Sequence, residues 1–253
     1  MRIYAIANQK GGVGKSTTAA NLAGGLARAG RRVLAVDLDA QAGLTFSLMG
    51  STRAREIKAG AYELLTGRAG ADEVVVEARP GLRLIPATDA LAAAEVELAG
   101  VQGRERILAD ALAGVQGVDY ALLDCGPSLG VVSIMGLTTA RAVLAPVLAE
   151  YLAVLAVGRL VQTITRIRAG LNPRLELAGI VITRYDERRV ANREGAEDLR
   201  RVFGKRVYDA MIRENIAIAE SSSHGFLIVE YRPGSHGAED YEKLTREFLR
   251  RST

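Results

Sequence analysis

The chain has 253 residues, of which 49% are hydrophobic but only 5% aromatic, and its formal net charge is +4. A chain of this length can bury one sizeable core, and an aliphatic composition favours a parallel sheet covered by helices on both faces. Its one cysteine, Cys125, excludes an internal disulfide and a metal cluster made of cysteines alone. No run of about 18 apolar residues predicts a membrane span, and no signal peptide is predicted. We therefore expect a cytoplasmic α/β protein.

A glycine-rich segment follows an apolar run at residues 3–7 and precedes an apolar pattern at helical spacing, residues 17–29. A strand, a glycine turn and a helix in this order bind phosphate, because the N–H groups of the turn and the positive end of the helix dipole converge on one point. Gly14, Lys15 and Ser16 match the core of a phosphate-binding loop, in which the lysine reaches the terminal phosphates and the hydroxyl coordinates Mg²⁺. The pattern predicts a nucleotide site.

The loop is a variant of the usual one, because Gln9 stands where a glycine is expected and a second lysine, Lys10, follows it. This variant resembles the deviant Walker A box of the ParA/Soj/MinD family of ATPases. In that family the extra lysine reaches across a dimer interface to phosphates held by the partner subunit. The resemblance implies ATP contacts along the whole loop, at Lys10, Gly11, Gly12, Val13, Gly14, Lys15, Ser16 and Thr17.

The same resemblance runs from residue 3 to about residue 249. It implies a single domain over residues 1–253, with a mostly parallel twisted sheet flanked by helices on both faces, as in P-loop NTPases. No internal repeat or linker contradicts one domain.

Two further apolar runs, residues 33–39 and 118–124, end in carboxylates: Asp37 and Asp39 in the first, Asp124 in the second. Ligands of open α/β sheets bind beyond the carboxyl ends of the strands, so these acids are expected beside the glycine loop. Phosphoryl transfer depends mostly on positioning and electrostatics, which a carboxylate near the terminal phosphate can supply. By resemblance, Asp39 is catalytic together with Lys10 and Lys15, while Ser16, Asp37 and Asp124 form the Mg²⁺ region.

Apolar runs and turn residues predict the other elements. Strands are expected at residues 74–76, 82–86, 142–147 and 176–183, and helices at residues 62–67, 90–100, 104–114, 151–171 and 235–250. The last helix carries Tyr241, Leu244, Phe248 and Leu249 on its apolar side.

Contacts to the nucleotide base are predicted from resemblance alone. In the family, the loop at residues 184–186 and the segment 211–215 border the adenine, which implicates Arg184, Arg213 and Asn215. Relatives usually read I-P-R-N where this chain has Ile212-Arg213-Glu214-Asn215. Arg213 replaces a proline and Glu214 replaces an arginine, so the chain departs furthest from the family pattern at these base contacts.

Basic residues are in excess only in the second half of the chain, residues 127–253, which holds 19 basic and 15 acidic residues. Arg188 matches a position where relatives contact DNA, whereas Ala217 replaces an arginine at another. The arginines that could compensate for it are Arg189, Arg193, Arg200, Arg201 and Arg213. The alternative interpretation is a solvated face in which these arginines pair with Glu187, Glu194, Glu197 and Asp198.

The resemblance implies a Mg²⁺-dependent ATPase that dimerises with ATP and binds double-stranded DNA non-specifically on the nucleoid, with slow hydrolysis stimulated by a ParB-like partner. A chromosome, a plasmid or a protein assembly are all compatible cargoes. A MinD-like membrane switch is a second hypothesis, although the Phe248-Leu249 pair is too short an apolar face for stable membrane association. A third hypothesis is a ligase of biotin or cobalamin metabolism, because some of these enzymes have a similar phosphate-binding loop. Their loop, however, lacks the lysine-glycine-glycine triplet at residues 10–12.

Overall fold

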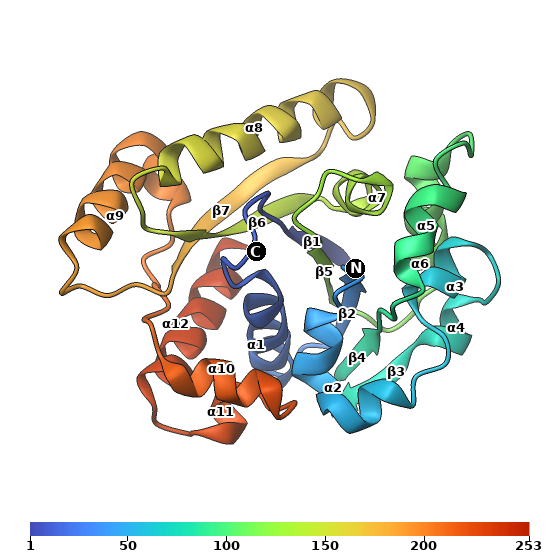
Figure 1. Ribbon diagram of the computed structural model, residues 1–253, viewed down its shortest axis with the longest axis horizontal. Coiled ribbons are helices and arrows are strands. Elements are labelled where there is room, and N and C mark those ends of the chain that lie inside the picture. Colours follow the sequence, from blue (N-terminus) through green and yellow to red (C-terminus); the bar gives the residue numbers. More distant parts are fainter. Residues whose placement is uncertain (253) are drawn as a thin grey trace.

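The computed structural model describes residues 1–252, and within them a seven-stranded sheet forms the centre of the molecule (Figure 1). The strands are β1 (Arg2–Ile6), β2 (Val33–Leu38), β3 (Val76–Arg79), β4 (Leu82–Ile85), β5 (Tyr120–Cys125), β6 (Ala142–Leu148) and β7 (Glu176–Thr183). Their order in space is β3-β4-β2-β5-β1-β6-β7, and only the β3–β4 pair is antiparallel. The predicted mostly parallel sheet is confirmed.

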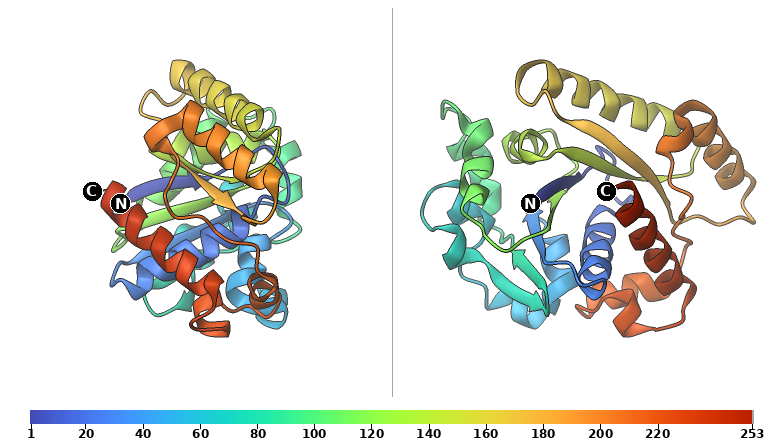
Figure 2. Two further views of the ribbon diagram at one scale, coloured as in Figure 1. Left: turned by 90° about the vertical axis from the view of Figure 1, so that its left-hand side faces the viewer. Right: turned by 180° about the vertical axis from the view of Figure 1, so that it is seen from behind.

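Helices cover both faces of the sheet, as the two further views make clear (Figure 2). One face carries α3 (Ala61–Leu65), α4 (Ala71–Val74), α5 (Leu91–Glu97), α6 (Ile107–Ala113), α7 (Val131–Thr139), α8 (Ala153–Gly170) and α9 (Val190–Phe203). The other carries α1 (Lys15–Arg28), α2 (Gly43–Arg55), α10 (Ile216–Ser223), α11 (Ile228–Tyr231) and α12 (His236–Arg251). Two 3-10 turns, η1 (Arg104–Arg106) and η2 (Gly204–Arg206), complete the described helices. One α/β domain results.

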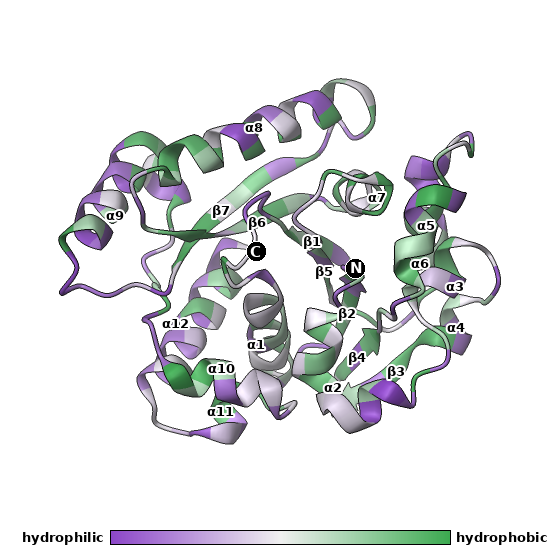
Figure 3. Cartoon of the chain, viewed as in Figure 1, coloured by the Kyte–Doolittle hydropathy of each residue, from purple (hydrophilic) through white to green (hydrophobic). Residues whose placement is uncertain are grey.

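The central strands are buried along their whole length, and this explains their composition. A strand covered on both faces needs a continuous apolar run, in contrast to the alternation of a half-exposed strand. The middle of the sheet is accordingly hydrophobic, while α8, α9 and α12 mix polar and apolar residues (Figure 3). Every residue of β2 and of β5 is buried, including one aspartate in each, Asp37 and Asp124. Two buried acids within apolar strands mark the functional edge.

Most predicted elements lie within a few residues of their observed bounds, but residues 74–76 do not form the predicted strand. Instead α4 ends at Val74 and β3 begins at Val76. The carboxylate of Glu73 accepts the N–H of Gly70 at 2.7 Å, which favours a helical turn where the apolar run alone favours a strand. Helices α2, α4, α7, α9, α10 and α11 have no predicted counterpart.

The last helix packs back onto the first strand. Phe248 of α12 lies edge-on to Tyr4 of β1, with ring centroids 4.8 Å apart, and Tyr241 and Leu244 are also buried. The predicted apolar side of this helix is therefore core. No helix among residues 1–252 combines the length and the apolar character needed to cross a bilayer.

Candidate functional site

The glycine loop between β1 and α1 has a backbone that depends on its glycines. Gly12 and Gly14 have φ angles of 71° and 81°, a left-handed conformation that costs other residues energy. Gly14 is also the N-cap residue of α1, so the unpaired N–H groups of the first helical turn open into the loop. The anion-binding conformation predicted from the sequence is present.

Polar side chains from distant strands hold this loop, and the sequence analysis did not single them out. The side chain of Asn8 donates to the carbonyl of Pro146 at 2.7 Å and accepts the N–H of Lys10 at 3.0 Å. The hydroxyl of Thr183, the last residue of β7, donates to the carbonyl of Val13 at 2.8 Å. Asn8 and Thr183 are polar residues at the ends of apolar strands, the same pattern that identified Asp37 and Asp124.

The loop opens into a cleft of about 790 Å³. Its walls bring together most of the predicted nucleotide contacts: Gly11, Gly12, Gly14, Lys15, Ser16, Thr17, Asp39, Arg184, Arg213 and Asn215. The Lys15 residue is only 7% exposed, so its charge is held inside the protein. Val13 is buried beneath the loop. Lys10 is not part of the cleft wall, and its ammonium forms an ion pair with Glu150, in the loop between β6 and α8.

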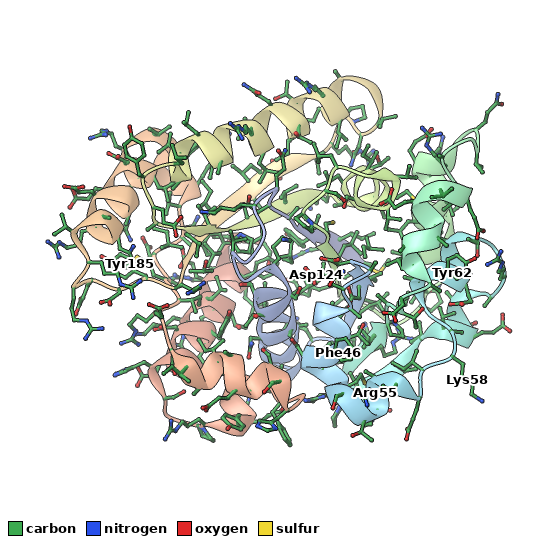
Figure 4. All side chains as sticks on the ribbon, viewed as in Figure 1. Phe46, Arg55, Lys58, Tyr62, Asp124 and Tyr185 are labelled. Carbon is green, nitrogen blue, oxygen red and sulfur yellow. The ribbon has the colours of Figure 1, made fainter. Side chains whose placement is uncertain are left out.

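Asp37 and Asp124 lie side by side beneath the cleft, because β2 and β5 pair in a register that places them opposite each other. Both are completely buried, and Figure 4 shows Asp124 near the centre of the molecule. Burial raises the pKa of Asp37 to about 6, against the hydrogen bonds from Thr45 and Asp39 that lower it. Burial, and then the neighbouring charge of Asp37, raise the pKa of Asp124 well above its usual range.

The two acids at the end of β2 have different surroundings. One Asp37 oxygen accepts both the N–H and the hydroxyl of Thr45, at 2.8 and 2.7 Å, and the other accepts the N–H of Asp39 at 3.2 Å. Asp37 is thus tied into the protein and absent from the cleft wall. Asp39 lies beyond the end of the strand, on the cleft wall, where it accepts the N–H of Gln41 at 3.0 Å. Its position suits the catalytic role predicted for it.

The surroundings of Asp124 fit a divalent cation. Neither of its carboxylate oxygens has a hydrogen-bond partner within residues 1–252, although the hydroxyl of Ser16 and the ammonium of Lys15 are near enough to lower its pKa. A buried carboxylate without a partner is costly, and a cation removes that cost. No group of three or more His, Cys, Asp or Glu in the same part of the chain is placed to hold a metal by itself. That arrangement suits Mg²⁺, which binds few protein carboxylates and keeps ligands from water and phosphate.

Comparisons with known proteins identify the family. A family model described as an AAA domain matches residues 1–177. The chromosome-partitioning ATPase Soj of Thermus thermophilus is 44% identical over 251 residues, which cover 99% of this chain and 96% of that protein. The chain belongs to the ParA/Soj family of ATPases. Chromosome partitioning protein ParA of Caulobacter vibrioides is also similar, with 41% identity over 256 residues that cover 99% of this chain and 95% of its own.

A solved structure that resembles this ParA/Soj chain is described as cobyrinic acid a,c-diamide synthase of Mycobacterium smegmatis with bound ADP and magnesium. It is 36% identical, with a TM-score of 0.85, and the match covers 99% of this chain and 94% of that one.

Beside the nucleotide cleft, the ParA/Soj chain has a second cleft of about 920 Å³ around the predicted DNA contacts. Arg188 is 87% exposed and pairs with Asp186 through two hydrogen bonds, of 2.9 and 3.0 Å. Arg189 pairs with Asp186 and with Glu214, and Arg193 donates to the carbonyl of Glu187 at 2.7 Å. Arg188 and Arg189 line this cleft and Arg193 does not, and each of the three already has an acceptor within the protein.

The carboxylates that pair with these arginines are mostly not the ones expected if the arginines formed only a solvated, ion-paired face. Of Glu187, Glu194, Glu197 and Asp198, only Asp198 forms an ion pair among the described residues, and its partner is Arg201. Around the cleft, the acids that pair with arginines are Asp186 and Glu214. Figure 4 shows Tyr185 in this region, in the loop that leads from β7 to α9.

Arg213 lies in the wall shared by the two clefts, and its side chain is bound to α12. Its Nε and Nη2 atoms donate to the buried carboxylate of Asp240, at distances down to 2.6 Å, and its N–H donates to the same group at 2.9 Å. Its contacts to base or DNA stay a prediction, and its charge is already compensated. Asn215 caps α10 by accepting the N–H of Ala217 at 2.9 Å.

Replacing Thr45 by valine is expected to destabilise the protein by about 1–3 kcal/mol, because the hydroxyl both donates to Asp37 and accepts the N–H of Ala87. The folded-state pKa of Asp37 lies above its ordinary value, so stability falls as pH rises from about 4 to about 6. Loss of the hydroxyl raises that pKa further. The deficit measured by urea unfolding should therefore be larger at about pH 8 than at about pH 5.

Thr45→Ser is the matched control, because it keeps the hydroxyl. This account of Asp37 would be contradicted if both variants lost the same free energy of unfolding. It would also be contradicted if the loss in Thr45→Val did not change with pH.

Proposed function

We propose that this chain is a Mg²⁺-dependent ATPase that dimerises when it binds ATP, binds double-stranded DNA without sequence preference, and so segregates or positions chromosomal or plasmid DNA. Slow ATP hydrolysis, stimulated by a ParB-like partner, releases it from the nucleoid. The whole chain acts as one cytoplasmic ATPase domain. The observation that carries this proposal is the cleft in which the glycine loop and Lys15 face Asp39, above the buried Asp124.

ATP and Mg²⁺ would be held by residues of the glycine loop and of the strand ends. The loop N–H groups and Lys15 bind the phosphates, and Ser16 with Asp124 provides oxygen ligands for Mg²⁺, which offsets charge on the phosphates. Asp39 orients the attacking water from the cleft wall.

The position of Lys10 supports a dimer. Its backbone is tied to Asn8, and its ammonium lies outside the cleft of its own chain, beside Glu150. A lysine held at the rim suits a contact to phosphates in a second copy. The pair with Glu150 is about half exposed and therefore weak enough to exchange for such a contact.

DNA binding by the ATP-bound dimer is expected to be sequence-independent and steeply salt-dependent. If the dimer makes about six phosphate contacts, its affinity should fall by about 10³-fold between about 50 mM and about 200 mM salt. Arg188→Ala should remove about one phosphate contact per subunit and so make the dependence of affinity on salt less steep. The reason is that the exposed guanidinium of Arg188 can exchange Asp186 for a phosphate. Fluorescence anisotropy with a short duplex of random sequence measures both.

Arg32→Ala provides the control, since Arg32 is exposed and paired with Asp119 but lines neither cleft. Absence of DNA retention by the ATP-bound protein at low salt would rule out the nucleoid-carrier function. A ParA-like ATPase with a protein cargo would then be the better description.

The MinD-like hypothesis requires an apolar face for lipid. Phe248 is fully buried and Leu249 is partly buried against the same core, so the short face expected from the sequence is smaller still. We therefore propose no stable membrane association. Sedimentation with liposomes, with and without ATP, tests this directly, and ATP-dependent co-sedimentation would contradict it.

The similarity to a protein described as a diamide synthase makes amide formation a second candidate activity. Nitrogen transfer from glutamine commonly uses a cysteine thiolate. The chain's one cysteine, Cys125, is buried, and burial raises the pKa of its thiol. This observation favours the partitioning function. Incubation with cobyrinic acid, ATP and either glutamine or ammonia tests the candidate, and an amidated product would support it.

A further inference from the structure

The carboxylate of Glu214 joins the two clefts. It lies in the wall that both share, and each of its oxygens forms an ion pair with a different arginine. Oε1 lies 3.0 Å from Nη2 of Arg184, which lines the nucleotide cleft, and Oε2 lies 2.8 Å from Nη2 of Arg189, which lines the second cleft. One acid thus neutralises a guanidinium on each side of the wall.

The backbone fixes Glu214 in this position. Its N–H donates to the carbonyl of Tyr185 at 3.0 Å, and the N–H of Tyr185 donates to the carbonyl of Ile212 at 3.0 Å, so the two segments pair like short strands. The preceding residue, Arg213, is bound to the buried Asp240. The backbone of Glu214 is therefore fixed, and this keeps its carboxylate within reach of both arginines.

The second cleft has more acidic than basic side chains, so its arginines are largely neutralised within the protein. Its lining contains five carboxylates, those of Asp186, Glu187, Asp209, Glu214 and Asp240, but only four Lys or Arg side chains. A cleft with that balance attracts a polyanion only if some of its arginines exchange their acids for phosphates. Glu214 pairs with one of these arginines, Arg189, and also with Arg184 of the nucleotide cleft. Asp186 pairs with Arg188 and Arg189.

We propose that Glu214 limits the affinity of this chain for duplex DNA, by competing with phosphates for Arg189 in the second cleft. This inference rests on the proposed function, because it names the residue that limits DNA binding at the same surface. Exposed ion pairs are weak, so a phosphate can replace the carboxylate. The displaced carboxylate nevertheless remains beside the phosphate and repels it, so the chain binds DNA more weakly than its arginines allow.

Glu214→Gln removes the charge at nearly constant volume and is expected to strengthen DNA binding. Each guanidinium freed for a phosphate should steepen the salt slope by about 0.9 and increase affinity by about tenfold at about 0.1 M salt. The gain should be about one such contact per subunit, that of Arg189, because Arg184 lines the nucleotide cleft. The measurement is anisotropy of a short random-sequence duplex with the full-length protein, ATP and Mg²⁺, over a range of salt concentrations.

Glu187→Gln is the matched control. It removes one charge from the same cleft, but the Glu187 carboxylate has no ion-pair partner among residues 1–252 and so releases no arginine. Its salt slope should equal that of the unmodified chain. Adding Arg189→Ala to Glu214→Gln should abolish the gain, which assigns the gain to Arg189.

The outcomes separate this inference from the proposed function. If Glu214→Gln and the unmodified chain bind DNA with equal affinity and slope, or if Glu187→Gln gains as much, the inference is overturned and DNA carriage stands. If only Glu214→Gln binds, the inference stands and DNA carriage by the natural chain falls. If neither binds at low salt, both are overturned. Unchanged thermal unfolding of the variants verifies that each comparison is between folded proteins.

Discussion

Lys15→Ala is expected to lose ATP binding. Lys15 is the buried cation of the nucleotide cleft, and its charge acts on Asp124 below as well as on the phosphates above. Removal of one partner from a buried charged contact costs about 2–5 kcal/mol, which corresponds to a loss of affinity of about 30-fold to several thousandfold. Titration calorimetry with ATP and Mg²⁺ measures the change.

Arg184→Ala is the comparison for Lys15→Ala within the same cleft. Arg184 lines the cleft too, but its side chain is more than half exposed and already paired with Glu214. Its removal should change ATP affinity much less. Wild-type affinity in Lys15→Ala, or an equal loss in both variants, would show that the glycine loop is not the phosphate site.

The second large effect is expected for Asp39→Ala, which should bind ATP normally but hydrolyse it at least about 100-fold more slowly. Asp39 is on the cleft wall, while the phosphate-binding loop is held independently by Asn8 and Thr183. The substitution therefore removes a group that positions water and leaves the binding loop intact. The ATP-bound dimer should persist, and size exclusion in ATP and Mg²⁺ should detect it.

Lys10→Ala distinguishes the two roles, because it should bind ATP and fail to dimerise. The ammonium of Lys10 lies outside its own cleft, so its loss leaves the binding of the first nucleotide unaffected. If Asp39→Ala and Lys10→Ala elute alike in ATP, then the separate assignments to hydrolysis and to dimerisation are wrong.

The phosphate loop and the acids at the strand ends were predictable because each is a local pattern. Gly14, Lys15 and Ser16 are consecutive, and Asp37 and Asp124 end apolar runs whose parallel pairing brings them together. The mostly parallel sheet followed from the same apolar runs. That part of the fold required only spacing and burial.

The partners of the charged residues were not predictable, because they come from segments far apart in the sequence. Lys10 pairs with Glu150, and Arg213 binds Asp240 on the last helix. An arginine count in residues 184–213 indicates where positive charge gathers, but it cannot show which acids face it. The strand expected at residues 74–76 begins two residues later, at Val76, because α4 extends to Val74 and Glu73 caps that helix.

The position of β1 has a consequence for how the chain folds during translation. This strand is synthesised before the other six strands of the sheet, but it lies between β5 and β6. Ile3 can pair only after Ala121 has been synthesised, and Ala5 only after Val143. The glycine loop then depends on Pro146 and Thr183. Pairing between such distant segments is slow to form. A nascent chain shorter than these segments exposes an apolar strand and lacks an organised loop, so nucleotide can stabilise it only late in synthesis.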